Sequence, residues 1–190
     1  MNSKVSGVFA AVPTPFAENG QPDTNRFLQH CEWVVSQGAN GLNVLGSTGE
    51  ATSQTGNARL QVMRAAANAS LGDAALMVGT GTPSIGETIE LTGHAAELGF
   101  DGALVLPPFY YAPVSEDGLF EYFSRVIESV AKTDMGIYLY NFPQMTGLEF
   151  SAELIERLLQ AFPNHMRGMK DSSGNLDYTN RMAASFSGRF

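Results

Sequence analysis

The stretch Met166-Arg-Gly-Met-Lys-Asp-Ser-Ser-Gly174 combines an apolar strand pattern, a lysine and a Ser/Gly turn. A buried strand is predicted over Met166 to Lys170, and a helix is expected to begin near Leu176. Lys170 therefore stands at the carboxyl end of a strand. Because an ammonium group is costly to remove from water, an interior lysine needs an ion-pair partner or serves chemistry. Position alone also fits a surface lysine at a strand exit, since lysine is mostly exposed.

The same strand, turn and helix unit repeats along the chain. Strands are predicted over 7–13, 41–45, 75–79, 102–106, 136–140 and 166–170, and helices over 22–37, 54–70, 84–98, 115–131, 151–161 and from 176 onward. Six units in 190 residues give roughly 32 residues per unit, which matches a βαβ repeat. We therefore predict an α/β fold.

Continuous apolar strands indicate a parallel sheet whose two faces are both covered by helices. An open doubly wound sheet and a (β/α)₈ TIM barrel both satisfy this pattern. A barrel requires eight strands and about 250 residues, so this chain would be a single TIM-barrel domain over residues 1–190 that lacks the last two βα units. The chain stops beside a helix at Ser185-Phe-Ser-Gly-Arg-Phe190, and we interpret it as a fragment of a longer protein. A complete open sheet is the alternative.

Composition excludes several classes of function. The net charge of −8 and the lack of a basic run argue against nucleic-acid binding. No apolar stretch approaches the ~20 residues of a membrane span, and the first residues lack a secretory signal. Cys31 is the only cysteine, so neither a disulfide framework nor a cysteine-based zinc site is expected. These features predict a cytoplasmic protein.

In either architecture a ligand binds at the carboxyl ends of the strands. The segments expected at this rim are 14–15, 46–50, 79–81, 108–111, 140–143 and 170–174. They supply hydroxyls, tyrosines and one amine, but no histidine. The three histidines lie on predicted helices and a loop, which argues against metal ligation.

Two rim segments carry chemistry. Gly46-Ser-Thr-Gly-Glu50 offers successive backbone N–H groups beside two hydroxyls, which suits a carboxylate or phosphate, although a plain strand-to-helix turn has the same sequence pattern. Tyr140 and Lys170 end neighbouring strands, which lie about 4.8 Å apart in a sheet. If both side chains point into a barrel, the phenol approaches the amine, an arrangement suited to proton relay.

At these positions the sequence resembles the dihydrodipicolinate synthase/N-acetylneuraminate lyase family. The matching motifs are Gly46-Ser-Thr-Gly-Glu50, Tyr140-Asn-Phe-Pro143 and Gly168-Met-Lys-Asp-Ser-Ser-Gly174, together with Pro13-Thr-Pro-Phe16 and Pro108-Phe-Tyr-Tyr111. Each motif alone is weak, but the five in this order and at these spacings are specific. The resemblance covers essentially the whole chain and favours the barrel.

The resemblance implies a class I pyruvate-handling lyase or aldolase that needs no metal or other cofactor and is usually a homotetramer. Lys170 would form a Schiff base with the ketone of pyruvate or another 2-keto acid, and Tyr140 would shuttle protons. Ser47 and Thr48 would hold the substrate carboxylate, with Thr48 also touching Tyr140. Tyr110 matches a tyrosine that family members present across a subunit interface to complete the proton relay of the neighbour.

One departure bears on the aldehyde partner. In the synthase branch an arginine two residues after the Tyr-Asn-x-Pro motif binds the carboxylate of that partner, and here this position is Met145. Methionine cannot form the forked, charged pair that arginine makes. We therefore expect cleavage or synthesis of a sugar-derived 2-keto acid, of the N-acetylneuraminate or 2-keto-3-deoxy sugar acid type. The alternatives are 4-hydroxy-tetrahydrodipicolinate synthase activity and a non-catalytic paralogue that only binds a keto acid.

Overall fold

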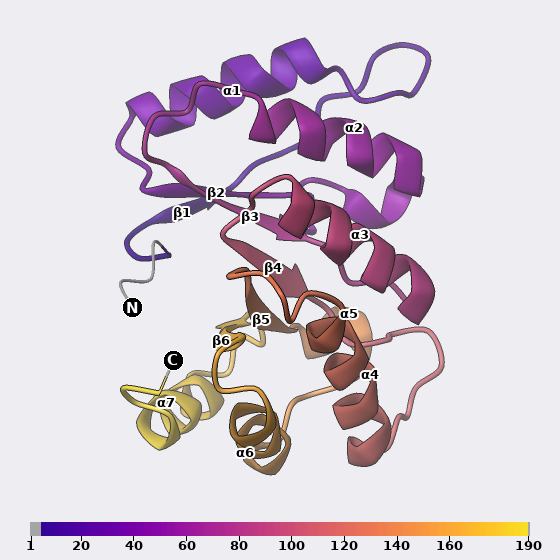
Figure 1. Cartoon of the computed structure of the whole chain (residues 1–190), viewed down its shortest axis with the longest axis vertical. Coiled ribbons are helices and arrows are strands. Elements are labelled where there is room, and N and C mark those ends of the chain that lie inside the picture. The colour runs from indigo at the N-terminus through magenta and orange to yellow at the C-terminus, as the bar shows by residue number, and fades with distance from the viewer. Residues whose placement is uncertain (1–4, 190) are drawn as a thin grey trace. The chain divides into compact units, whose positions relative to one another are not determined.

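Each of the six predicted apolar runs forms a strand in the computed structural model, which describes residues 5–189. The strands are β1 (Phe9–Ala11), β2 (Gly41–Val44), β3 (Ala75–Gly79), β4 (Gly102–Val105), β5 (Gly136–Asn141) and β6 (Met166–Asp171). They follow the order β1-β2-β3-β4-β5-β6 in the sheet, and β1–β2, β2–β3 and β5–β6 pair in parallel (Figure 1). A doubly wound sheet would reverse its order at a switch point. The sequential order therefore confirms a TIM-barrel winding with six βα units in this chain.

Helices follow the strands as predicted, with ends shifted by at most three residues. They are α1 (Thr24–Ser36), the 3₁₀ helix η1 (Ala51–Ser53), α2 (Gly56–Ala67), α3 (Ile85–Glu97), α4 (Glu116–Ser129), α5 (Pro143–Thr146), α6 (Ala152–Ala161) and α7 (Leu176–Ser185). Six of them follow a polar residue whose side chain accepts a hydrogen bond from the N–H three residues on. These residues are Asp23, Thr55, Ser84, Ser115, Ser151 and Asn175. Such caps satisfy N–H groups that the first helical turn leaves unpaired.

Besides the 3₁₀ helix η1, which was not predicted, two local features differ from the sequence prediction. β1 covers only Phe9–Ala11 instead of residues 7–13. At the start of the strand, Gly7 has a left-handed φ of 92°, so the extended conformation begins only after Gly7. The short helix α5 was not predicted, because four residues carry no helical periodicity. Pro143 at its first turn and Gly147 at its left-handed C-cap are the signals that mark it.

The chain divides into two compact units. A single domain over residues 1–190 stays a prediction. The first unit contains the chain up to Thr80 and Leu91–Ala103. Within it, α1 and α2 pack against each other and against β2 (Figure 1). Fully buried side chains of all three elements form its core, namely Phe27, Cys31, Leu42, Val44, Val62 and Met63.

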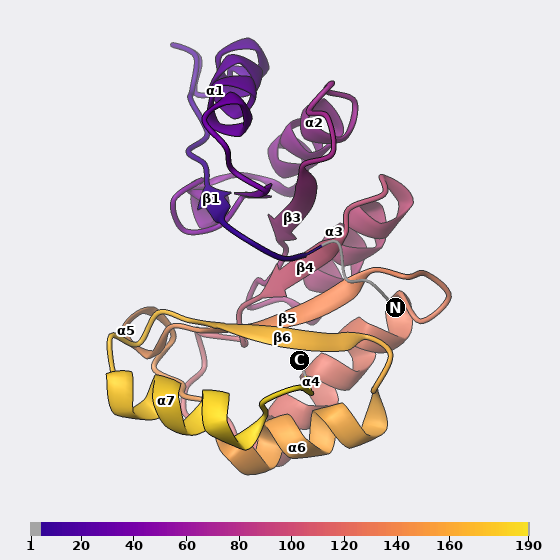
Figure 2. The same ribbon diagram turned by 90° about the vertical axis from the view of Figure 1, so that its left-hand side faces the viewer.

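The second unit contains Gly81–Glu90 and the chain from Leu104 onward. Figure 2 shows α4, α6 and α7 on the same side of β5 and β6. Ile137 and Leu139 of β5 are fully buried, as are Val126 and Ile127 of α4 and Leu154, Ile155 and Leu158 of α6. The Phe123 and Phe150 rings meet edge to face, with centroids 5.6 Å apart. This core supports the two strands that carry Tyr140 and Lys170.

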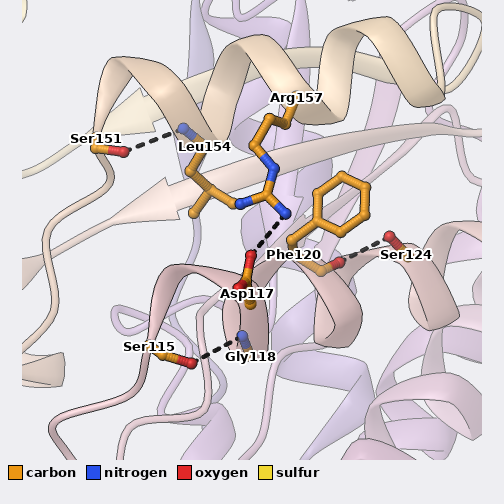
Figure 3. A network of polar contacts seen from close by, with 8 residues as sticks. All are labelled: Ser115, Asp117, Gly118, Phe120, Ser124, Ser151, Leu154 and Arg157. Carbon is orange, nitrogen blue, oxygen red and sulfur yellow. Dashed lines mark hydrogen bonds and ion pairs between the residues drawn. The ribbon is translucent and has the colours of Figure 1, made fainter.

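A polar contact joins α4 to α6 at the rim of this core (Figure 3). The Arg157 guanidinium donates to Asp117 Oδ1 at 2.8 Å and lies over the Phe120 ring, 4.6 Å from its centroid. Asp117 is largely exposed, so the ion pair itself contributes little, and the stacking of Arg157 on Phe120 adds apolar contact. The stacking of Arg157 on Phe120 is therefore the larger part of this contact between α4 and α6.

A substitution of Gly79, at the end of β3, can test how tightly the first unit is packed. A Cβ on Gly79 would lie 2.2 Å from the Leu45 carbonyl oxygen, which is backbone and cannot rotate away. Gly79→Ala should therefore destabilise the protein by about 1–3 kcal/mol in denaturant unfolding. Gly93→Ala is the matched control: no atom lies within 4 Å of that Cβ, and alanine in the interior of α3 should stabilise by roughly 0.5–1 kcal/mol. Equal stabilities of the two variants would contradict this packing.

Candidate active site

Lys170 and Tyr140 lie opposite each other on the parallel strands β6 and β5. The Lys170 ammonium is 4.0 Å from the centroid of the Tyr140 ring, a cation–π contact. The Tyr140 side chain is buried, and its ring stacks on Phe142 with centroids 5.6 Å apart. Lys170 is exposed, so of the two alternatives left open by its position the surface lysine at a strand exit is the one observed. The result is an amine open to a small molecule beside a fixed phenol.

Gly168 makes room for a second tyrosine on the same face. It pairs with Tyr138 in the β5–β6 register, and a Cβ at position 168 would lie 2.9 Å from Cδ1 of Tyr138. Because residues two apart in a strand share a face, Tyr138 and Tyr140 lie side by side along β5. Glycine at position 168 thus leaves space for Tyr138, which lies next to Tyr140 on the face that carries Lys170.

Asp171, on the opposite face of β6, has four hydrogen-bond donors around its carboxylate. Its Oδ1 accepts from Asn141 Nδ2 at 2.8 Å and from the Ser173 N–H at 3.0 Å. Its Oδ2 accepts from Ser173 Oγ at 2.9 Å and from Thr179 Oγ1. Asp171 is therefore engaged away from Lys170, as strand alternation predicted for the two neighbours.

Asn141 completes this cluster from β5. Asn141 is fully buried, and both polar atoms of its amide are hydrogen-bonded: Nδ2 donates to Asp171, and Oδ1 accepts from the Phe150 N–H at 3.2 Å. Its backbone carbonyl accepts from the Ser172 N–H at 2.8 Å. Gln144 of α5 donates to the Ser173 carbonyl. Asn141, Ser173 and Thr179 were not predicted as site residues from the sequence, although the pairing of Asn141 with Asp171 follows from that of Tyr140 with Lys170 one residue earlier.

The pKa of Asp171 reflects these contacts. Partial burial opposes ionisation, but the hydrogen bonds from Thr179, Asn141 and Ser173 outweigh it, and the pKa of the carboxyl lies below its ordinary value. Asp171 is thus an anion at neutral pH, as four donors require.

The turn from Gly46 to Glu50 is rigidly built within the first unit. Leu45 and Glu50 hold left-handed φ angles of 54° and 50°, and the Glu50 N–H donates to the Ser47 carbonyl at 3.1 Å. The Gly49 carbonyl accepts from Thr14 Oγ1 and Gln54 Nε2, each at 2.8 Å. Ser47 and Thr48 are exposed at the tip of this turn. Their predicted contact with a substrate carboxylate, and that of Thr48 with Tyr140, stay predictions.

Tyr110 and Met145 are surface residues of the second unit. Tyr110 is 73% exposed and meets Tyr111 edge to face, with ring centroids 5.0 Å apart. Met145 projects from α5 and is 67% exposed. Both positions leave the side chains open to another molecule, while their predicted roles toward a neighbouring subunit and an aldehyde stay predictions.

The described residues contain no group of three or more His, Cys, Asp or Glu side chains that could hold a metal ion. None of the helices formed within residues 5–189 is long and apolar enough to cross a membrane.

Comparison with known proteins gives consistent matches. The model of the Dihydrodipicolinate synthetase family matches residues 4–190. A curated 4-hydroxy-tetrahydrodipicolinate synthase from Methanothrix thermoacetophila is 35% identical over 176 residues, which is 93% of this chain. The chain spans 57% of the length of that relative.

Solved structures agree with the fold. A prophage protein of the dihydrodipicolinic acid synthase family from E. coli K12, solved in complex with pyruvate, superposes with a TM-score of 0.90 at 32% identity. The match covers 97% of this chain and 60% of that one. A sialic acid aldolase from Ruminococcus gnavus superposes with a TM-score of 0.92 over all of this chain and 61% of the aldolase, at 21% identity. This last likeness concerns the fold alone.

Asp171→Asn should lower stability in a pH-dependent way. The folded-state pKa lies below the ordinary 3.8, so the ionised carboxylate stabilises the fold above that pH, and the contribution is lost as pH falls through the folded pKa. Asparagine should cost about 1–3 kcal/mol at pH 7, because donors lose a charged acceptor. In denaturant unfolding the difference from wild type should shrink toward pH 3.

Asp177→Asn is the control for this measurement. Asp177 is exposed in the first turn of α7 and undergoes the same change of charge. It should change stability little at either pH. If Asp171→Asn unfolds at pH 7 with the same denaturant midpoint as the wild type, the four hydrogen bonds do not stabilise the fold.

Proposed function

We propose that this chain, which belongs to the Dihydrodipicolinate synthetase family, carries the Schiff-base centre of a class I pyruvate-type lyase or aldolase. The observation that supports this most is the Lys170 ammonium over the Tyr140 ring at the carboxyl ends of two parallel strands. Family membership adds weight, since a relative of 32% identity was solved with pyruvate. No cofactor is needed in this proposal, because the substrate itself becomes the electron sink.

The chemistry begins with the Lys170 amine. The neutral amine attacks the ketone carbon of pyruvate or another 2-keto acid, and loss of water from the resulting carbinolamine gives a protonated imine. The imine withdraws electrons from the neighbouring carbon. In cleavage, the hydroxyl of the substrate loses its proton and the bond between this neighbouring carbon and the hydroxyl-bearing carbon breaks, which releases an aldehyde and leaves an enamine. In synthesis, the enamine carbon attacks the aldehyde carbonyl, whose oxygen takes up a proton.

Protons must move at each of these steps. Tyr140 is proposed to give a proton to the aldehyde oxygen during synthesis and to remove it during cleavage, since its ring is fixed beside Lys170. Ser47 and Thr48 are proposed to bind the substrate carboxylate through hydroxyls and backbone N–H groups of their turn. Tyr110, exposed and paired with Tyr111, is proposed to complete the relay of another subunit in a homotetramer.

Met145 supports a sugar-derived 2-keto acid as the substrate of this centre. Its exposed thioether offers no charge to a carboxylate on the aldehyde partner. The N-acetylneuraminate or 2-keto-3-deoxy sugar acid type, whose aldehyde half carries hydroxyls, fits this neutral position. A second candidate is 4-hydroxy-tetrahydrodipicolinate synthesis, which is favoured by curated 4-hydroxy-tetrahydrodipicolinate synthases that are 35% identical to this chain.

Borohydride reduction in the presence of pyruvate tests the Schiff base. The intact protein should gain the mass of one reduced pyruvate adduct, and peptide mapping should place it on Lys170. Lys170→Arg should remove the adduct, because a guanidinium keeps the charge but forms no imine. Lys132→Arg, which changes an exposed lysine elsewhere in the second unit, should leave it intact. Absence of any adduct in the wild type would refute the lyase proposal and favour a keto-acid-binding protein.

Met145→Arg tests the aldehyde specificity. An arginine there should raise kcat/KM for aldehydes that bear a carboxylate by about tenfold or more relative to polyhydroxy aldehydes, through a charge-assisted pair. Met145→Leu, which adds no charge, is the matched control and should not shift the ratio. An unchanged ratio across an aldehyde panel for Met145→Arg would exclude position 145 as a specificity determinant.

A further inference from the structure

Two consecutive residue pairs of the β5–β6 register differ in chemistry. Tyr140 pairs with Lys170, and the next pair along is Asn141 with Asp171. Neighbouring residues of a strand point to opposite faces, so the reactive pair and the amide–carboxylate pair lie back to back across the same sheet. On one face stands an exposed amine, and on the other a fully buried asparagine.

We propose that Asp171 is a positioning residue for Lys170. This proposal rests on the proposed function, since Lys170 matters here as the Schiff-base nucleophile. Asp171 touches no reacting atom in it. Its carboxylate fixes the end of β6 from the rear face, and that fixes where the Lys170 side chain leaves the strand.

The contacts of Asp171 reach three different elements. Asn141 binds it from β5, Ser173 from the turn after β6, and Thr179 from the first turns of α7. Each carboxylate oxygen accepts two hydrogen bonds, which fixes both the position and the plane of the group. A strand end held in this way cannot twist without breaking charge-assisted bonds.

The donors are themselves held in place. Ser173 Oγ accepts from the Asn175 N–H at 3.1 Å, and Thr179 Oγ1 also contacts the Asn175 carbonyl at 3.1 Å. Asn175 in turn caps α7 by accepting from the Tyr178 N–H at 3.1 Å. The start of α7 therefore serves as a rigid anchor for the carboxylate, and through it for the strand position next to Lys170.

The same cluster also holds the end of β5, which carries Tyr140. Asn141 follows Tyr140 directly, and its amide is bound by Asp171 on one side and by the Phe150 N–H on the other. One cluster thus sets the spacing of both strand ends. We expect its loss to change how often the amine and the phenol are correctly arranged, rather than how well pyruvate is held.

Thr179 gives the sharpest test, since it can be changed without altering Asp171 or charge. Thr179→Val keeps the shape and removes the hydroxyl, while Thr179→Ser keeps the hydroxyl. In borohydride trapping over a pyruvate series, Thr179→Val should lower the maximal trapping rate by about tenfold, with a half-saturating pyruvate concentration within about twofold of wild type. Thr179→Ser should restore most of the rate. Asp177→Asn should trap at the wild-type rate.

The outcomes separate the two proposals. If the wild type forms no adduct, the proposed function fails and the role of Asp171 fails with it. If the wild type forms the adduct and folded Thr179→Val traps at the wild-type rate, only the positioning role is overturned. A rise in half-saturating pyruvate with an unchanged maximal rate also overturns it, as this indicates a binding defect. If circular dichroism shows that Thr179→Val is unfolded, Ser173→Ala, which removes another donor to Asp171, decides in its place.

Discussion

The parallel pairing of β5 with β6 is the constraint on which the candidate site depends. It sets Tyr140 opposite Lys170 and, one step further, Asn141 opposite Asp171. Because strand residues alternate between faces, a single register places the Tyr140–Lys170 pair on one face of the sheet and the hydrogen-bonded Asn141–Asp171 pair on the other. A slip by one residue would exchange these faces and bury the amine, so the fully buried Asn141 and its pairing with Asp171 act to hold the register.

Sequence patterns predict most of this arrangement because they record burial and periodicity. Six apolar runs and their caps predicted the strands and the six long helices, and the sequential sheet order then separated barrel from open sheet. The neighbouring strand ends predicted that Tyr140 approaches Lys170 if both side chains point into a barrel, and the observed register sets the two residues opposite each other. Hydrophobic pattern does not encode short local structure, which explains why the four-residue helix α5 was missed.

The hydrogen-bond partners were the part that sequence did not predict. Asn141, Ser173 and Thr179 are ordinary polar residues in a sequence, and only their convergence on one carboxylate gives them a role. The exposure of Lys170 matches one of the two interpretations that its position left open, a surface lysine at a strand exit. Side-chain networks depend on the relative placement of elements, which periodicity cannot supply.

The contrast between α5 and the cluster behind it has an evolutionary consequence. Met145 stands in solvent and can be replaced at little cost to folding, whereas Asn141, four residues earlier, cannot. Natural selection can therefore alter the outward residues of this segment while Lys170 keeps its support. Under the proposed function, such a scaffold can diversify in the aldehydes that it accepts without a change in the step that captures the keto acid.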